Sequence, residues 1–228
     1  MKPIHKNVVR LGSTLLLALS ATLTARADYQ STVLSQNPSG FYRLDGTLSP
    51  QPNGGATNSG SLGAAANGTF VALPTLNAPG PFSGSVSIGL DGTSQYINTP
   101  VTAGLNTATF TYEIWVNPAT IPKFAYMSSS AQLNSPRSGW YFAQDDGSTF
   151  ALGSAWVFRT FNQNAANPLF TVAAPVTPGW TYLAVTFDGT SLKIYTNGVF
   201  CQSTNDASGI HLCADYGCAV HSWHPQFA

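Results

Sequence analysis

The sequence predicts an all-β fold, an antiparallel β-sandwich, on three observations. Short runs rich in β-branched and aromatic residues alternate apolar and polar positions, and Asp-Gly and Asn-Gly pairs separate them. After residue 27, no stretch of helix length repeats with the period of an α-helix. Charged residues make up only 8% of the 228-residue chain, and Glu113 is its one glutamate. Long surface helices need more Glu, Lys and Arg than this, so composition excludes a helical bundle.

Residues 1–27 are expected to form a secretory signal peptide. Three positive charges precede an apolar, uncharged segment at residues 11–23, and Ala25-Arg26-Ala27 fits the small-x-small cleavage pattern. The apolar segment is shorter than the ~20 residues that a bilayer span needs. A short uncleaved anchor is the alternative. We therefore expect a secreted, extracellular protein with no transmembrane span once the signal has been removed.

The exported chain is expected to be mildly acidic. Cleavage after residue 27 removes four of the nine positive charges and no acidic residue, which changes the formal net charge from zero to −4. A chain without a basic excess cannot neutralise many phosphates by counterion release. The composition therefore excludes nucleic acid as a partner and favours a neutral ligand, or a cation.

The first half of the mature chain combines an irregular segment with short strands. Residues 28–44 are apolar and aromatic, and residues 45–68, rich in Gly, Asn, Ser and Ala, indicate a long loop. Apolar residues then alternate with small ones from residue 86 to residue 90, before an Asp-Gly turn. Residues 110–116 have a period of two, so the following four side chains share one face: Phe110, Tyr112, Ile114 and Val116.

Three turn signals predict hairpins in the second half. Asp-Gly or Asn-Gly between two apolar runs is a strong short-range hairpin signal. The signals lie at residues 145–148, at residues 188–191 and at Asn197-Gly198. The strands that flank the first two comprise residues 140–144, 150–152, 180–187 and 192–196. Strands at this spacing favour an antiparallel sandwich.

The C-terminal segment, residues 201–228, differs in composition from the rest of the chain. Strand periodicity ends after Phe200, and the segment contains three cysteines and three histidines: Cys201, Cys213, Cys218, His211, His221 and His224. Zinc accepts these ligand types, and exported cysteines usually pair, which would leave one free thiol. Because the spacing fits no closed zinc module, we interpret the cluster as chance residues in an aberrant tail.

Three segments carry a resemblance to a known family. Residues 32–44 look like its N-terminal strand, residues 110–118 (FTYEIWVNP) are similar to its central strand, and residues 180–199 (WTYLAVTFDGTSLKIYTNGV) are similar to its late strands. The family is that of the laminin-G-like, or concanavalin A-like, jelly-roll domains of secreted bacterial proteins. The resemblance implies a jelly-roll domain over residues 28–200. The family's closing strands have no match here, which indicates either a truncation or frame change near Cys201 or a genuine alternative ending.

The resemblance also raises the question of glycoside hydrolysis, because this fold hosts glycan hydrolases. Retaining hydrolysis needs two carboxylates about 5–5.5 Å apart. The family's enzymes place two glutamates two or four residues apart on one strand, whereas Thr111 and Trp115 flank Glu113 on its own face. The missing pair predicts that the protein is not an enzyme.

Calcium is the candidate cofactor, because lectin-like relatives often bind it through loop carboxylates and carbonyl oxygens. The candidate ligands are the aspartates at the predicted turns: Asp91, Asp145, Asp146 and Asp188. Turn formation is the alternative role for each of them, since Asp-Gly pairs serve backbone geometry. The sequence has no D-x-D-x-D spacing, which favours the turn interpretation.

Aromatic residues are 12% of the chain and predict candidate sugar-stacking positions. Trp115 and Trp180 occupy positions of the family motifs and are expected in the core. Trp140, Tyr141 and Trp156 are the candidate ligand-binding residues, with burial in the core as the alternative for each.

We expect a secreted, non-catalytic binding or adhesion module whose partner is a glycan. A structural or protein-interaction domain, with a cell-surface protein as its partner, is the second interpretation, and a glycoside hydrolase is the third. The resemblance supports the fold more strongly than the ligand, because one fold hosts many functions.

Overall fold

The computed structural model describes residues 28–46, 54–121, 123–132, 137–147, 153–162, 170–205, 220–222 and 226–227. The strand pairings within these ranges are antiparallel, which confirms the predicted all-β class. The predicted signal peptide, residues 1–27, lies outside the described residues. In the described part of the chain, no helix is both long enough and apolar enough to cross a bilayer.

The elements are short and follow one another closely. The helical elements are the α-helix α1 (Tyr29–Ser35) and the 3-10 helices η1 (Gly63–Ala66) and η2 (Ala103–Leu105). The strands are β1 (Thr69–Val71), β2 (Thr75–Pro79), β3 (Val86–Asp91), β4 (Tyr96–Thr99), β5 (Phe110–Val116), β6 (Ala125–Gln132), β7 (Ser138–Asp146), β8 (Ser154–Asn162), β9 (Phe170–Pro175), β10 (Thr181–Phe187), β11 (Ser191–Thr196), β12 (Val199–Asn205), β13 (Val220–Ser222) and β14 (Gln226–Phe227).

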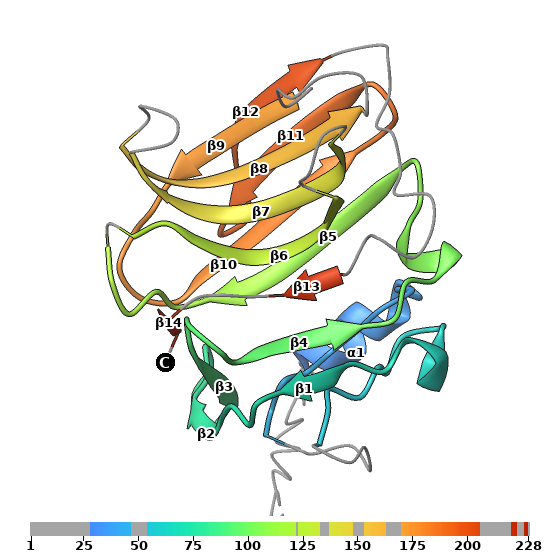
Figure 1. Ribbon diagram of the computed structural model, residues 1–228, viewed down its shortest axis with the longest axis vertical. Coiled ribbons are helices and arrows are strands. Elements are labelled where there is room, and N and C mark those ends of the chain that lie inside the picture. The colour runs from blue at the N-terminus through green and yellow to red at the C-terminus, as the bar shows by residue number, and fades with distance from the viewer. Residues whose placement is uncertain are drawn as a thin grey trace, which may run out of the picture.

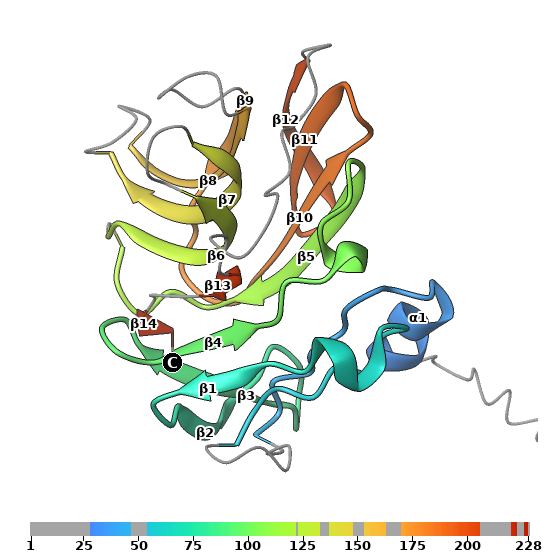
Figure 2. The same cartoon turned by 45° about the vertical axis from the view of Figure 1, so that its right-hand side comes forward.

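Two four-stranded sheets form the sandwich and face each other (Figure 2). One has the strand order β6-β7-β8-β9, and the other has the order β12-β11-β10-β5. Two smaller three-stranded sheets, β1-β4-β13 and β14-β3-β2, lie at one end of the sandwich (Figure 1). This is the jelly-roll arrangement that the resemblance implies.

The segment after residue 200 takes part in the sheets. Strand β12 pairs with β11 and continues to Asn205, past the predicted domain boundary at residue 200. Strand β13 pairs with β4 and contacts β6, and β14 pairs with β3. The prediction that strand structure ends after Phe200 is therefore wrong for these described residues, because backbone pairing is open to any sequence with free N–H and C=O groups.

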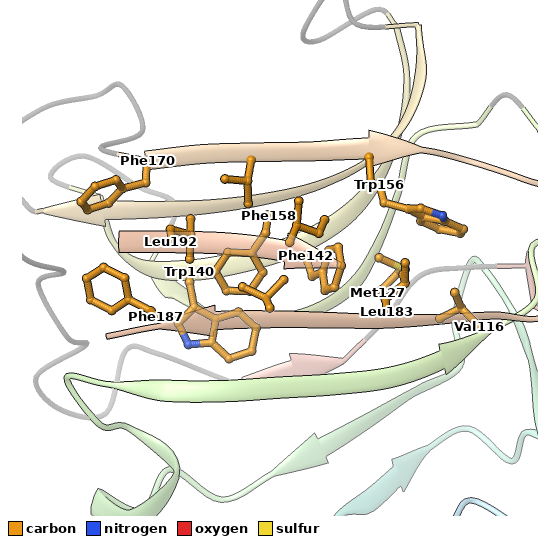
Figure 3. Close-up of a cluster of buried hydrophobic side chains, with 14 residues drawn as sticks. Val116, Met127, Trp140, Phe142, Trp156, Phe158, Phe170, Leu183, Phe187 and Leu192 are labelled. Atoms are coloured by element: carbon orange, nitrogen blue, oxygen red, sulfur yellow. The ribbon is translucent and has the colours of Figure 1, made fainter. Parts of the chain in front are cut away.

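The core lies between the two large sheets and is dominated by aromatic side chains (Figure 3). Trp140 on β7 stacks on Phe158 of β8, with ring centroids 5.2 Å apart and ring planes inclined by 22°. Phe142 meets the same Phe158 ring edge-on at 5.5 Å. The predicted face of β5 points into this core, where Val116 is buried. Each large aromatic ring buries about 150–250 Å², so this cluster supplies most of the burial that holds the sheets together.

The hairpins at the two later turn signals are confirmed. Strands β10 and β11 pair across the turn at residues 188–191, with Phe187 opposite Leu192. Asn197 and Gly198 both have positive φ, 50° and 79°, and connect β11 to β12. Two successive residues in the left-handed region match the right-handed twist of the flanking strands, which explains the Asn-Gly pair.

Two predictions about local structure are corrected. Residues 32–35, expected in an N-terminal strand, instead belong to helix α1, because Asp28 caps the start of the helix by accepting a 2.7 Å hydrogen bond from the Ser31 N–H. Asp145 and Asp146 lie inside strand β7, opposite Ala155 and Ser154, so the β7–β8 connection begins after them.

In the described part of the long loop predicted before β1, residues 54–68, one buried side chain, Asn58, organises the backbone. Its Oδ1 accepts hydrogen bonds from the backbone N–H groups of Phe41 (2.7 Å) and Gly60 (2.8 Å). Its Nδ2 donates to the carbonyl oxygens of Ser39 (3.3 Å) and Gly63 (3.2 Å). One amide therefore satisfies four backbone groups in a segment that has little regular secondary structure.

Strand β9 is joined to the opposite sheet by a side chain. The Gln202 Oε1 atom on β12 accepts a 2.6 Å hydrogen bond from the backbone N–H of Ala173 on β9. This contact satisfies an edge N–H that would otherwise be available to another strand. The two large sheets thus meet along β9 and β12.

Replacing Gly139 by alanine should destabilise the fold more than an ordinary positive-φ glycine substitution. Gly139 has φ +81°, and a Cβ there overlaps the carbonyl oxygen of Ser130 on β6. Gly179, with φ +87° and nothing within 4 Å of an added Cβ, is the matched control. We expect G179A to lower the free energy of unfolding by about 1–2 kcal/mol and G139A to lower it further. Urea unfolding measures both, and equal losses would contradict the steric explanation.

Candidate functional site

The side of sheet β6-β7-β8-β9 that faces away from the core carries a second cluster of side chains. Strand alternation turns Trp140 and Phe142 of β7 inward and turns Tyr141 to the other side. On β6, a register shift after Tyr126 leaves Met127 in the core and Tyr126 on the outer face. We call this side of the sheet the outer face.

The outer face has a row of aromatic rings. Tyr126 meets Tyr141 edge-on, with ring centroids 5.1 Å apart, and Tyr141 lies 5.8 Å from Phe161 of β8. Phe124, just before β6, meets Tyr126 edge-on at 5.1 Å. Tyr141 is only 5% exposed and Phe161 is buried, whereas Tyr126 is half-buried. The accessible part of the row is therefore Phe124 and Tyr126, which pack against the buried rings beside them.

Two arginines are held against this row. The Arg137 guanidinium lies over the Phe161 ring, with Cζ 5.7 Å from the ring centroid. Arg159 is the cross-strand partner of Tyr141, and the two side chains are hydrogen-bonded. Both arginines are half-buried. Ring stacking and hydrogen bonding restrict two long side chains that would otherwise be free to rotate.

The charges on the outer face influence one another. Burial lowers the pKa of Arg159, and the nearby charge of Arg137 lowers it as well. The Tyr141 hydroxyl and the Asp145 carboxylate act in the opposite direction and raise the pKa of Arg159. Burial raises the pKa of Tyr126, while the positive charges of Arg137 and Arg159 lower it. The Tyr126 hydroxyl therefore lies within electrostatic range of both guanidinium groups. This convergence of one phenol and two guanidinium groups is our candidate binding site.

Asp145 lies on the same face, further along β7. Its side chain is fully buried, and neither carboxylate oxygen accepts a hydrogen bond from the described residues. A buried carboxylate without donors is costly, and such groups concentrate at functional sites. Its charge acts on Arg159 from a distance and favours the charged form of that arginine.

Two of the three predicted sugar-stacking residues lie in the core instead. Trp140 is 8% exposed and Trp156 is 0% exposed, and both belong to the cluster between the sheets (Figure 3). Strand alternation turns the even-numbered side chains of β7 and β8 inward. Burial in the core was the alternative expected for both tryptophans. Tyr141 does lie on the outer face, where it orients Arg159 rather than presenting an open ring.

The four candidate calcium ligands are not brought together. Asp145 and the adjacent Asp146 point to opposite sides of β7, and Asp91 and Asp188 lie in separate turns. No group of three or more His, Cys, Asp or Glu side chains in the described ranges is arranged to hold a metal ion. The structure therefore places these four aspartates apart, as turn and strand residues.

Asp91 and Asp188 use their carboxylates to close turns. Asp91 Oδ1 accepts hydrogen bonds from the backbone N–H groups of Thr93, Ser94 and Gln95, at 2.9, 2.9 and 3.0 Å. These bonds hold the pKa of Asp91 well below its ordinary value. Backbone bonds from Ser191 and Thr190 likewise lower the pKa of Asp188.

The expectation that Trp115 belongs to the core is wrong. It lies on the side of β5 that faces away from the core, half-buried against Phe82 and Tyr182, with centroid distances of 5.1 and 5.2 Å. Tyr29 of α1 packs on it edge-on at 6.4 Å. This packing attaches helix α1 to the sandwich. Trp180, also expected in the core, is half-buried.

The cysteine and histidine cluster lies mostly outside the described residues. Cys201, on β12, is a free thiol whose Sγ lies 3.3 Å from the Thr196 hydroxyl. His221 lies on β13. The other members lie outside the described ranges, namely Cys213, Cys218, His211 and His224.

The residues that define the candidate site were not predicted from the sequence. Tyr126 lies on β6, Arg137 directly before β7, and Arg159 on β8, and none of them belongs to a local motif. The available signal was the scarcity of positive charge: two of the five Lys and Arg residues after residue 26 lie within this stretch of strands.

The sequence pattern of the concanavalin A-like lectin/glucanases superfamily matches residues 91–218, more than half of the chain. The protein belongs to this superfamily. The matched segment includes every residue of the candidate site. No curated protein matches the chain.

Solved structures resemble the fold. A crystal structure of an HCR/D mutant is 14% identical, with a TM-score of 0.57, and covers 84% of this chain and 47% of its own. The binding domain of botulinum neurotoxin serotype D is 12% identical, with a TM-score of 0.53, and the match covers 82% of this chain and 49% of that domain's chain. Domain 4 of an extracellular arabinanase from Geobacillus stearothermophilus, in complex with arabinotriose, is 15% identical, with a TM-score of 0.43. This match covers 76% of this chain and 69% of the arabinanase domain. The chain spans about half the length of the first two, and identities this low show the fold alone.

The Asp91 turn predicts a pH-dependent contribution to stability. Because the pKa of Asp91 is lower in the folded chain than its ordinary 3.8, the carboxylate stabilises the fold above that value and loses the effect as the pH falls. Asp91→Asn should therefore lower the melting temperature at about pH 7, and the difference from wild type should shrink towards about pH 2. Thermal unfolding followed by circular dichroism measures this, with Asp188→Asn expected to behave alike. A difference that stays constant with pH would rule out the charge as its cause.

Proposed function

We propose that the protein is a non-catalytic carbohydrate-binding module whose ligand lies on the outer face of sheet β6-β7-β8-β9. The observation that carries this proposal is the convergence of half-buried Tyr126, Arg137 and Arg159 over buried aromatic rings. An aromatic ring can pack on the apolar face of a sugar, and the phenol and guanidinium groups supply hydrogen bonds to its oxygens. A site of apolar support with a few convergent polar groups is typical of small-molecule recognition.

The placement of the carboxylates supports a binding role over hydrolysis. Glycosidases need two carboxyl groups about 5–5.5 Å or about 6.5–9.5 Å apart. Glu113 lies on the side of β5 that faces away from the core, and Asp145 lies on the outer face of the opposite sheet. Packed sheets are about 10 Å apart, and these two side chains point away from each other. They therefore do not form a catalytic pair.

The binding module is proposed to act outside the cell after export by residues 1–27. A protein partner at the cell surface is the second candidate function. The β11–β12 hairpin favours it, because Val199 and Phe200 are 65% and 54% exposed. Single exposed apolar residues are common on protein surfaces, so we rank glycan binding first.

Loss of the Tyr126 ring should weaken glycan binding without unfolding the protein. We expect Tyr126→Ala to reduce affinity about twofold to tenfold, the effect of an aromatic contact worth about 0.5–1.5 kcal/mol. Tyr195→Ala is the matched control, because Tyr195 is a half-buried tyrosine on β11 of the other sheet, packed edge-on against Phe200. A glycan array followed by titration calorimetry, with and without calcium, measures binding. Failure of the wild-type chain to bind any polysaccharide would reject the proposal.

Hydrolysis is tested separately. We expect no release of reducing sugar from polysaccharides, because the only glutamate has no carboxylate partner on its own strand. A reducing-sugar assay on the same panel measures this. Release that disappears in Glu113→Gln would show instead that the protein is a glycoside hydrolase.

A further inference from the structure

Positive charge is concentrated on the outer face although the exported chain is acidic. The chain has five Lys and Arg residues after residue 26, and two of them, Arg137 and Arg159, converge on Tyr126. A cationic pair of this kind in a chain with so little positive charge needs an explanation. Scattered surface arginines would lie far apart and would make no joint contacts.

The two guanidinium groups are held in place before any ligand arrives. Phe161 lies beneath Arg137, and the buried Tyr141 hydroxyl is hydrogen-bonded to Arg159. Ordering a free arginine on binding costs about 0.5–1.5 kcal/mol per side chain. The supporting rings reduce this cost, which is an arrangement expected of a site that binds through its arginines.

Two like charges that lie close together repel each other, and an anion bound between them reduces this repulsion. Arg137 lies close enough to Arg159 to disfavour its charged form, whereas the Asp145 carboxylate favours that form. Neither Asp145 oxygen accepts a hydrogen bond from the described residues, so this carboxylate acts only through its distant charge. A bound anion would remove the repulsion and would accept charge-assisted hydrogen bonds from both arginines.

We propose that the saccharide bound on the outer face is acidic, and that a carboxylate of a uronic acid residue accepts hydrogen bonds from Arg137 and Arg159 beside Tyr126. This inference rests on the proposed function and names its ligand class. The planar fork of arginine matches the two oxygens of a carboxylate, which distinguishes this site from one built for a neutral sugar. The site therefore recognises charge as well as the shape of the ring.

The inference is tested with a panel of uronate polysaccharides, namely polygalacturonate, alginate and hyaluronan, each compared with its carboxyl-reduced form. Reduction replaces the carboxylate by a neutral hydroxymethyl group and keeps the sugar backbone. We expect the full chain to bind at least one uronate polymer, with binding lost after reduction and weakened by added salt. Sulfated dextran is included to separate recognition of a carboxylate from recognition of any anion.

Variants of the two arginines locate the interaction. Arg137→Gln and Arg159→Gln should each weaken uronate binding about tenfold to a hundredfold, because each loses a charge-assisted hydrogen bond. Lys193→Gln, which removes one positive charge from β11 of the other sheet, should leave affinity unchanged. Arg137→Lys and Arg159→Lys keep the charge but lose the fork, and should recover only part of the affinity. Melting temperatures confirm that each variant is folded.

The outcomes separate the two proposals. Binding to neutral glycans only, equal binding before and after carboxyl reduction, equal or tighter binding to sulfated dextran, or full affinity in the folded arginine variants would overturn the acidic-ligand inference. Each of these results would leave the carbohydrate-binding function standing. No binding to any neutral or acidic polysaccharide would reject that function itself.

Discussion

Burial of the aromatic rings of β7 and β8 between the two large sheets determines the orientation of the side chains on both strands. Four rings enter the core together, and the loss of any one would leave a large cavity: Trp140, Phe142, Trp156 and Phe158. Because successive residues of a strand point to opposite sides, burial of this set turns Tyr141 and Arg159 to the outer face. A slip of one residue in strand register would turn the core side chains outward and the outer-face side chains inward. The packing of the core therefore determines which side chains form the candidate site.

The outer face illustrates how a chain with little net charge can present a charged site. Net charge is summed over the sequence, whereas recognition depends on the few charges that lie within about 10 Å of one another. The rings of Tyr141 and Phe161 restrict two arginines that the net charge of the chain does not reveal. The expectation of a neutral ligand was drawn from the net charge alone, whereas the acidic saccharide proposed above is inferred from the placement of these side chains.

Strands and hairpins could be predicted from the sequence with fair success in the second half of the chain. The periodicity of residues 110–116 and the turns at residues 188–191 and Asn197-Gly198 gave the correct strands, hairpins and buried faces. Predictions failed where a local signal had two physical explanations. Asp145 stands before an Asp-Gly pair yet continues a strand, and residues 32–35 look like a family strand yet lie in a helix that Asp28 caps.

The sequence by itself determined the all-β class, the family and the turn-forming role of Asp91 and Asp188, because period-two alternation and Asp-Gly geometry act over a few residues. Only the tertiary structure decided which side chains meet on the outer face. Tyr126, Arg137 and Arg159 come from separate segments of one sheet, and their proximity depends on sheet register and on a shift in β6. Register results from the packing of the whole core, which no single segment of sequence encodes.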